Sequence, residues 1–506
     1  MTLSPNQVLY PRPLHFEERG GVHFVIEPSG PNWIGTNAAG ARLLRALDAP
    51  TSVREALSAY VDGEGAEEAT RPNEDGAAFL TDAVAAGLVA LEPVTARAYQ
   101  GRAAALEPTR LEEFWVQIND FCNLTCEHCL VSSSPAGGHG LPADTVRDAV
   151  EQALALGAEM VGFTGGEPFF REDLFDLYAL ILEDPSRVVT TLTNGTRLTG
   201  TRLEQLKEVA SSRLELRISL DGPTAEVNDP IRGSGSFDGA TRGIRNVLET
   251  RCGVTVTMAL NGANAPYADQ MPGLLKSLGV TRLHVLWPFQ RGRAIEAGQD
   301  TNLTPSVEQV IQGYRRLRDA AQAAGIMFFT YDSWKTRIDG APGLKYDLAN
   351  HCWSSLCLYT NGHVFPSPAL MQHPELSLGD LATSSLRDLW IESDVAHRFR
   401  AASVIDRPQC QSCHYRFLCG GGDMDHVYNS SRVRQADHGD LLADDPYCDL
   451  YKEVIADAMV DLSNPGAQGP EHTTRPRVVR QMGHRPNMPP KLLVPGEVAL
   501  ATIPST

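Results

Sequence analysis

The sequence predicts an α/β fold built on a parallel sheet, and three observations indicate it. Between residues 111 and 289, six short apolar segments alternate with longer segments of helical periodicity. Strand–helix units repeated in series imply a parallel sheet with helical crossovers, either open or curled into a partial barrel. The conspicuous polar motifs also follow the strands directly, at the edge where such folds gather their chemistry.

The individual elements can be placed in order. Strands are expected at 114–120, 160–166, 188–195, 214–222, 254–261 and 282–289, and helices at 143–156, from 171, from 202, from 237 and at 267–278. The motifs "CNLTCEHC", "GGEP", "NGT" and "SLDG" follow the first four strands. Beyond about residue 330 the regular alternation stops and the remaining clustered cysteines appear.

Residues 1–95 are expected to form a small separate α+β unit. "VHFVIEP" and "NWIGTN" have the composition of strands around a Pro-Ser-Gly-Pro turn. A first helix places Leu43, Leu44 and Leu47 on one face. The second helix opens with a capping box from Ser52 to Glu55, and a third runs from about 74 to 86 before the strand "LVALEP".

Composition excludes several classes of protein. The N-terminus has neither the basic nor the apolar region of a signal peptide, and no apolar run is long enough to cross a bilayer, so a cytoplasmic location without membrane attachment is expected. A formal charge of −18 argues against nucleic acid as a partner. Residues 463–506 are rich in proline and polar residues and are expected to be a flexible tail.

Nine of the ten cysteines lie in or near short-spaced sets, which in a reducing compartment favours metal binding. Cys122, Cys126 and Cys129 fall within eight positions. A structural zinc site requires four protein ligands, and neither a fourth cysteine nor His128, expected to point away, completes this loop. Three thiolates instead suit a four-iron cluster with one iron left open to substrate.

The motif CxxxCxxC followed by a strand and "GGEP" resembles the radical S-adenosylmethionine (SAM) enzymes. The resemblance implies a partial (β/α)6 TIM-type barrel at 106–325, a [4Fe-4S] cluster on Cys122, Cys126 and Cys129, and SAM chelated to its open iron. Cleavage of SAM then yields a 5′-deoxyadenosyl radical that abstracts hydrogen from substrate. The resemblance also implies cofactor-binding roles: the SAM amino group would be held by Gly165, Gly166, Glu167 and Pro168, the ribose would lie near Asn194, Ser219 and Asp221, and the SAM carboxylate would pair with Arg232.

Residues 326–462 resemble the cysteine-rich SPASM extension of that family. The resemblance assigns one auxiliary [4Fe-4S] cluster to Cys410, Cys413, Cys419 and Cys448, with a zinc ribbon as the alternative. A second cluster would use Cys352, Cys357 and Asp423, but Ser367 stands where cysteine is expected, and the sequence leaves open whether this site holds a cluster. Ser367-Pro368 also replaces the Cys-Asp pair of sulfatase-maturing relatives, which disfavours that reaction.

The N-terminal unit resembles the winged-helix-like peptide chaperone known as a RiPP recognition element. That resemblance implies a precursor leader peptide bound by strand addition near "HFVIEP", with apolar side chains packing around Phe79, Leu80 and Val84. The alternative is a winged-helix module that docks elsewhere or contacts DNA.

Together these resemblances imply an enzyme: a radical SAM peptide maturase that forms a thioether or carbon–carbon crosslink, epimerises a centre or oxidises a side chain. Its partners would be a precursor peptide and a reductant such as flavodoxin or ferredoxin. The alternatives are a radical SAM enzyme acting on a small molecule or cofactor precursor, and a non-catalytic iron–sulfur protein.

Overall fold

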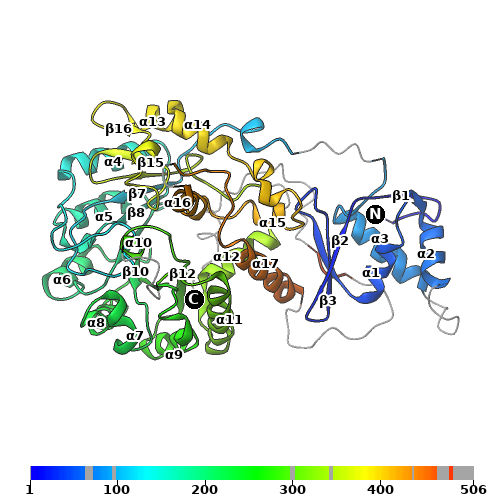
Figure 1. Ribbon diagram of the computed structural model, residues 1–506, viewed down its shortest axis with the longest axis horizontal. Helices are drawn as coiled ribbons and strands as arrows, with labels where there is room; N and C mark the ends of the chain where they lie inside the picture. Colours follow the sequence, from blue (N-terminus) through cyan, green and yellow to red (C-terminus); the bar gives the residue numbers. More distant parts are fainter. Residues whose placement is uncertain are drawn as a thin grey trace.

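A ten-stranded sheet forms the centre of the molecule in the computed structural model (Figure 1). The structure describes residues 2–62, 72–93, 99–296, 303–340, 346–435, 438–463 and 478–481. Six parallel strands lie side by side in chain order, as the sequence predicts: β7 (Glu113–Gln117), β8 (Met160–Thr164), β9 (Val188–Thr193), β10 (Leu214–Ser219), β11 (Gly253–Ala259) and β12 (Arg282–Leu286).

The crossovers between these strands are helical, as predicted. The main crossover helices are α4 (Ala143–Ala155), α5 (Leu174–Leu182), α6 (Gly200–Val209), α8 (Ser236–Leu248) and α9 (Met271–Leu278). Because consecutive strands are neighbours, right-handed crossovers place all these helices on one face, and the sheet curls into a partial (β/α)6 barrel with its carboxyl ends together.

The sheet continues at both ends of the barrel. At one end β13 (Met327–Phe328) pairs with β12, between α11 (Val307–Ala324) and α12 (Phe329–Asp339). At the other end β14 (Ser355–Leu358) runs parallel to β7, and β15 (His363–Phe365) and β16 (Gly379–Asp380) follow antiparallel. The cysteine-rich segment is therefore joined to the barrel by main-chain hydrogen bonds, and not only by a linker.

The helices of that segment lie beside the barrel. They are α13 (Leu386–Glu392), α14 (Asp394–Ala401), α15 (Arg416–Cys419), α16 (Met424–Gln435) and α17 (Cys448–Ser463). Helix α17 extends from the barrel to the N-terminal sheet (Figure 1).

The N-terminal unit has two small sheets and three helices. One sheet has β2 (His15–Arg19), β3 (Val22–Ile26) and β4 (Trp33–Thr36), and the other has β1 (Val8–Pro11) between β5 (Thr51–Ser52) and β6 (Val89–Ala90). The helices are α1 (Ala38–Arg45), α2 (Val53–Asp62) and α3 (Pro72–Ala85). The predicted capping box is present: the N–H of Ser52 donates to Glu55 and the N–H of Glu55 donates to Ser52 Oγ.

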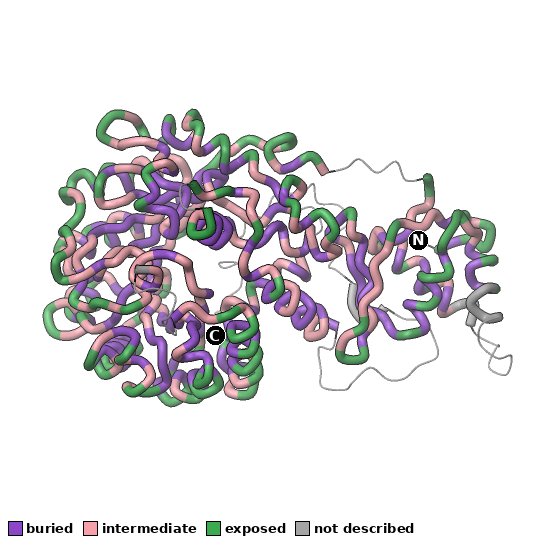
Figure 2. The backbone as a smooth tube through the Cα atoms, viewed as in Figure 1, coloured by how far each residue is buried: buried purple, intermediate pink, exposed green. Residues whose placement is uncertain are grey.

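The unit is less separate than expected, because its strands β3 and β4 are buried on both faces. Val25 and Ile34 belong to the unit's own core, whereas Phe24 and Trp33 belong to the main core of the barrel. The indole Nε1 of Trp33 donates to the carbonyl of Ile338 in α12 (3.2 Å). Buried chain is accordingly found in the barrel, in α17 and in the N-terminal strands (Figure 2).

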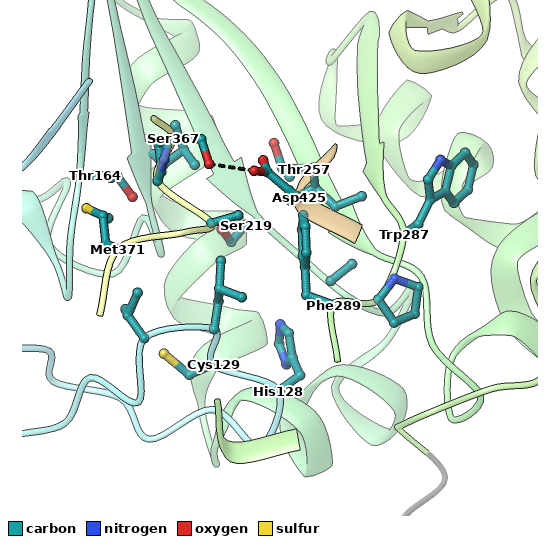
Figure 3. A pocket seen from close by; sticks show the side chains of 18 of the residues that line it. His128, Cys129, Thr164, Ser219, Thr257, Trp287, Phe289, Ser367, Met371 and Asp425 are labelled. Atoms are coloured by element: carbon teal, nitrogen blue, oxygen red, sulfur yellow. Dashed lines mark hydrogen bonds between the residues drawn. The ribbon is translucent and has the colours of Figure 1, made fainter. Parts of the chain in front are cut away.

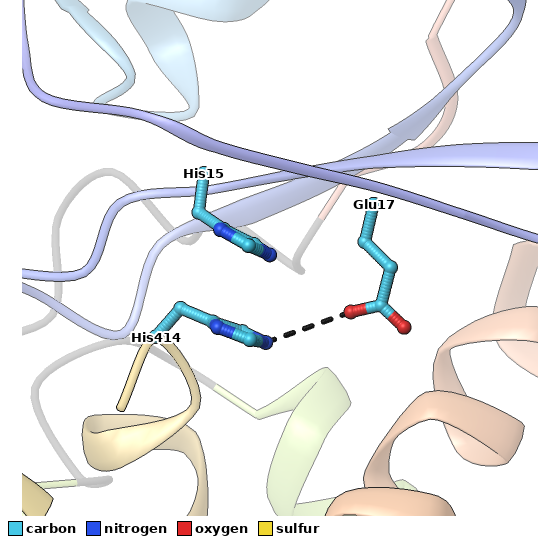
Figure 4. A group of neighbouring side chains, drawn as sticks. All are labelled: His15, Glu17 and His414. Carbon is cyan, nitrogen blue, oxygen red and sulfur yellow. Dashed lines mark ion pairs between the residues drawn. The ribbon is translucent and has the colours of Figure 1, made fainter. Parts of the chain in front are cut away.

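Alternate side chains of β2 attach the unit to the cysteine-rich segment. His15 stacks on His414 with ring centroids 3.6 Å apart, and Glu17 Oε2 lies 3.6 Å from His414 Nε2 (Figure 4). The hydroxyl of Tyr415 also donates to Glu17, and Arg19 pairs with Glu453 of α17. Since residues i and i+2 of a strand share a face, one face of β2 is committed to this contact.

The expected flexible tail contains a strand, so the prediction of an unstructured 463–506 is wrong for that part. Val478–Gln481 forms β17, which pairs antiparallel with β4. Residues 464–477 and 482–506 lie outside the described residues.

Candidate active site

The three clustered cysteines lie in the loop that follows β7, at the carboxyl end of the first barrel strand. The N–H of Cys122 donates to the carbonyl of Ser134 (3.0 Å), and that of Cys129 to the carbonyl of Cys126 (3.1 Å). Arg293 holds the loop from the far side of the barrel, because its Nε donates to the Cys126 carbonyl at 2.8 Å. All three cysteines line one cavity.

The two glycines after β8 are required by a close approach of two backbones. A Cβ on Gly165, where φ is +148°, would stand 2.4 Å from the carbonyl oxygen of Asn119, and one on Gly166 would stand 2.0 Å from that of Phe121. The N–H of Gly166 donates to the Asn119 carbonyl (2.8 Å). Any side chain here would push the cysteine loop away, so the Gly-Gly pair positions that loop.

Glu167 is fully buried, and its carboxylate serves the protein itself. It accepts hydrogen bonds from Thr193 Oγ1 (2.7 Å), from the N–H of Asn194 (2.8 Å) and from the N–H of Phe169 (3.2 Å). Burial raises the pKa of Glu167 to about 7, although these hydrogen bonds lower it. Gly165 and Gly166 line the cavity, whereas Glu167 and Pro168 are buried behind its wall.

Two further predicted residues, Asn194 directly after β9 and Ser219 at the end of β10, line the cavity. The amide Nδ2 of Asn194 lies 3.7 Å from Cys122 Sγ and donates to Asn123 Oδ1 at 3.0 Å.

Arg232 and Asp221, which were expected to contact different parts of SAM, form a buried ion pair with each other. Arg232 Nε lies 2.6 Å from Asp221 Oδ2, and Asp221 is fully buried while Arg232 lines the cavity. Burial alone would lower the pKa of Arg232, but Asp221 together with the thiols of Cys126 and Cys129 outweighs that effect, and the pKa is raised. Asp221 also accepts from the N–H of Ala259 (2.7 Å), so it orients the guanidinium from behind.

The expectation that His128 points away from the cysteine loop's site is wrong. Its Nε2 lies 3.2 Å from Asp221 Oδ2, and its ring lines the cavity beside Cys129 (Figure 3). Burial lowers the pKa of His128 to about 4, so the ring is neutral at pH 7.

The cavity has a volume of about 620 Å³ and is bounded by the barrel and by the cysteine-rich segment. Thr164, Ser219 and Thr257 come from strand ends, and Trp287 and Phe289 follow β12 (Figure 3). The opposite wall is built from the cysteine-rich segment and includes Ser367, Met371 and Asp425.

The cavity wall contains buried polar atoms that have no hydrogen-bond partner in the protein, and these atoms show which kind of ligand the wall fits. Among the described residues, these atoms include Ser133 Oγ, His128 Nδ1, Thr257 Oγ1, His284 Nδ1, Asn350 Oδ1 and His351 Nδ1. Unpaired polar groups at such depth are costly, so a wall of this kind fits a ligand rich in hydrogen-bonding groups. Burial also raises the pKa of Cys122 to about 12, so its thiolate requires a cation. A cationic metal cluster with a polar cofactor therefore fits the residues present.

The four cysteines of the auxiliary set are brought together around a second, small cavity. Cys410, Cys413, Cys419 and Cys448 line it with Asp445. Cys448 begins α17 and Cys419 ends α15, which places thiols from separate segments within one site. Burial raises the pKa of Cys419 and of Cys448 to about 12, so these thiols also favour a bound cation. Their role as iron ligands stays a prediction.

The degenerate auxiliary set does not assemble in the same way. Cys352 and Cys357 are fully buried members of the main apolar core, and Cys357 sits within β14, where its Sγ lies 3.2 Å from Met371 Sδ. Ser367 Oγ donates instead to Asp425 Oδ1 (2.6 Å). Asp423 lines the active-site cavity, which neither Cys352 nor Cys357 does.

Several residues that line the cavity were not predicted from the sequence. His351 Nε2 lies 2.8 Å from the same Asp425 oxygen that Ser367 contacts, and Arg293 and Phe289 carry no motif. For Asp425, the sequence offers one signal: it lies two positions after the end of the "CGGGD" motif.

Comparison with known proteins agrees with this geometry. The model of the radical SAM superfamily matches residues 116–270, and that of the iron–sulfur cluster-binding SPASM domain matches residues 351–414. Mycofactocin maturase MftC of Mycolicibacterium smegmatis is 31% identical over 311 residues, covering 60% of this chain and 75% of that protein. AdoMet-dependent heme synthase of Oleidesulfovibrio alaskensis is 25% identical over 317 residues, covering 60% and 80%.

Solved structures share the fold. Native anSMEcpe with bound AdoMet has a TM-score of 0.56 at 16% identity and covers 70% of this chain and 99% of that one. Streptococcus suis SuiB bound to the precursor peptide SuiA has a TM-score of 0.52 at 12% identity and covers 88% and 99%. None of the helices in the described ranges has the length and apolarity needed to span a membrane.

Proposed function

The chain belongs to the radical SAM superfamily and carries a SPASM domain, and from that premise we propose that it is a maturase of a ribosomally synthesised precursor peptide. Its cofactors are a [4Fe-4S] cluster, S-adenosylmethionine and auxiliary iron–sulfur clusters. When bound, the first cluster and SAM supply a 5′-deoxyadenosyl radical that abstracts a hydrogen atom from substrate.

The chain's own residues divide this work. Cys122, Cys126 and Cys129 would hold the first cluster, and Cys410, Cys413, Cys419 and Cys448 an auxiliary one. Arg232, kept in place by Asp221, would pair with the SAM carboxylate, while the backbone of Gly165 and Gly166 would face its ammonium. Asn194 and Ser219 would lie near the ribose, and Glu167, Pro168 and Asp221 would act from behind the wall.

The opposite wall and the segment that follows β12 would meet the substrate. Trp287, Phe289 and Met371 offer apolar contact, and the hydrogen-bonded pair Ser367 and Asp425 offers a fixed acceptor (Figure 3). Such a mixture suits one side chain of a peptide, held by apolar packing and oriented by a few polar groups.

The observation that carries the peptide over a small molecule is the N-terminal unit. It lies outside both matched family segments and offers a sheet, β2–β4, that shares an apolar core with α3. Residues 96–506 are about four fifths of the chain, so the 88% covered by the SuiB likeness extends into this unit. SuiB was solved with a precursor peptide bound, and to the unit of this chain we assign the task of holding a leader.

The test is peptide turnover by mass spectrometry. Purified holoenzyme with SAM and reduced flavodoxin or ferredoxin should modify a peptide encoded beside its gene, and a crosslink or an oxidised side chain changes the mass of that peptide. Epimerisation leaves the mass unchanged, so the reaction is run in deuterated water to report exchange. A protein that changes none of these peptides would contradict the proposal.

A second candidate is supported by the heme synthases among the relatives. On that hypothesis the substrate is a tetrapyrrole or another cofactor precursor, and the cavity of about 620 Å³ must accept it. Consumption of iron-coproporphyrin by the same preparation, with no peptide changed, would favour this candidate.

The auxiliary site can be tested separately from turnover. A variant with Cys122, Cys126 and Cys129 all replaced by alanine should still carry about one four-iron cluster, because the second set of four thiols is complete without them. Iron and sulfide analysis after anaerobic reconstitution gives the count, and a value near zero would contradict the assignment. Well over four irons per chain would show that the region of Cys352, Cys357 and Asp423 also holds a cluster.

A further inference from the structure

The N-terminal sheet has one edge suited to accept another strand. In the order β17-β4-β3-β2, strand β3 lies between two neighbours, so the predicted addition next to "HFVIEP" is wrong. One face of β2 is attached to the cysteine-rich segment through His15 and Glu17 (Figure 4) and through Arg19. The predicted contacts Phe79 and Leu80 are also buried in the unit's own core. Of the two edges of this sheet, β2 and β4, the edge of β4 is the one that pairs with an added strand among the described residues, so strand addition is placed there.

That edge is occupied by a strand of the same chain. Val478 pairs with Thr36, Arg480 with Gly35 and Gln481 with Ile34, antiparallel. Strand β17 also lies near α3 and α17, and we call the strip that it occupies, along β4 and near these two helices, the β4 groove. Main-chain pairing of this kind recognises an extended peptide with little dependence on its side chains.

The fit between β17 and β4 is imperfect. The register shifts between Val478 and Arg480, which leaves one residue of β17 without a partner on β4. Gly35, in the middle of β4, contributes no side chain to cross-strand packing. A segment that pairs without this bulge would form a more regular ladder and could replace β17.

We propose that β17 is a competitor built into this chain: it occupies the edge of β4, where the leader's extended segment would add as an antiparallel strand, and it leaves that edge when the leader displaces it. This rests on the proposed function. The sequence of β17 and of the residues before it indicates the preferred chemistry of the occupant: two adjacent valines, with three arginines between residues 475 and 480, in a chain whose formal charge is −18.

Competition between β17 and the leader lowers the apparent affinity of the leader for the edge of β4. Only 14 residues join the end of α17 to β17, so the tail competes as a tethered ligand at an effective concentration on the order of millimolar. A peptide from solution binds only the fraction of molecules whose groove is empty, and its apparent affinity falls by that fraction.

The experiment measures fluorescence anisotropy of a labelled peptide with the sequence of residues 472–486. The full-length double variant Val478→Pro, Val479→Pro removes two donors from β17 and should bind this peptide about 10-fold or more tightly than the parent chain. The matched control Asn487→Pro, Met488→Pro changes the tail beyond β17 and should behave as the parent. A chain ending at Ser463 should resemble the double variant.

Equal affinity in all four proteins, or no binding to any, would overturn the proposal. A labelled peptide that itself carries proline at both valine positions should fail to bind, and its binding would equally count against strand addition.

Turnover separates this inference from the proposed function. With a modified precursor in hand, the double variant should lower the KM for that peptide about 10-fold while kcat and the KM for SAM stay unchanged. A precursor modified by both proteins with the same KM would overturn leader docking at β4 and leave the proposed function standing. Failure of both proteins to modify any peptide would contradict the proposed function, while the anisotropy would still decide whether β17 fills the groove.

Discussion

Replacing Cys126 with alanine is expected to reduce formation of 5′-deoxyadenosine from SAM to below about 1% of the parent rate, since loss even of an outer partner of a metal ligand costs 10- to 100-fold. Cys126 is one of the three cysteines that follow β7 and line the cavity. Its Sγ lies 3.6 Å from the carbonyl oxygen of Arg232. Anaerobically reconstituted and reduced protein, assayed by chromatography without substrate, provides the measurement.

The matched control is Cys252→Ala. Cys252 precedes β11, lies outside both cavities and packs against the main core, so its replacement should leave SAM cleavage near the parent rate. Persistent cleavage in the Cys126 variant would remove the catalytic interpretation of the cysteine loop. Loss of cleavage in both variants would indicate a general defect in folding or reconstitution.

Replacing Trp33 with alanine is expected to lower the free energy of unfolding by about 3–5 kcal/mol, the usual cost of removing a buried indole. Trp33 is fully buried, donates to Ile338 of α12 and packs edge-on against Phe24 at a centroid distance of 6.3 Å. Because these contacts cross from the N-terminal sheet to the barrel, the loss should destabilise both parts together. Denaturant unfolding followed by circular dichroism and by cluster absorbance gives the measurement.

Trp33→Phe is the control, since it keeps an aromatic ring and gives up mainly the hydrogen bond, worth about 0.5–1.5 kcal/mol. If Trp33→Ala lowered only an early transition and left the absorbance of the clusters unchanged, the N-terminal sheet would fold independently and the shared core would be wrong. The same core explains why deleting residues 1–95 is a poor test of leader binding: the deletion exposes barrel surface that Phe24 and Trp33 cover.

Local chemistry explains why much of the site could be predicted from sequence. CxxxCxxC places three thiols on one loop, and Gly165-Gly166 is dictated by backbones that approach within van der Waals distance. The strands of the barrel were also predictable, because each is a short apolar run followed by a helix with a clear period. Cys410, Cys413, Cys419 and Cys448 could be grouped because a known pattern spans them, although Cys448 is 29 positions from Cys419.

Other features depend on contacts between distant segments and carry no local signal. His128 meets Asp221 across 93 positions, and Ser367 meets Asp425 across 58. Asp221 was expected at a ribose, but burial makes an unpaired carboxylate too costly there, and Arg232 lies close enough to neutralise it.

The sequence by itself determined the parallel barrel, the cysteine loop and the glycine pair, because periodicity, spacing and steric need are properties of neighbouring residues. Only the tertiary structure decided that the N-terminal sheet shares the barrel's core, that β3 is an inner strand, and that β17 pairs with the edge of β4. The physical reason is that a strand's local sequence specifies its extended backbone and its apolar face, whereas its hydrogen-bonding partner is selected by whichever unpaired edge the folded chain brings near it.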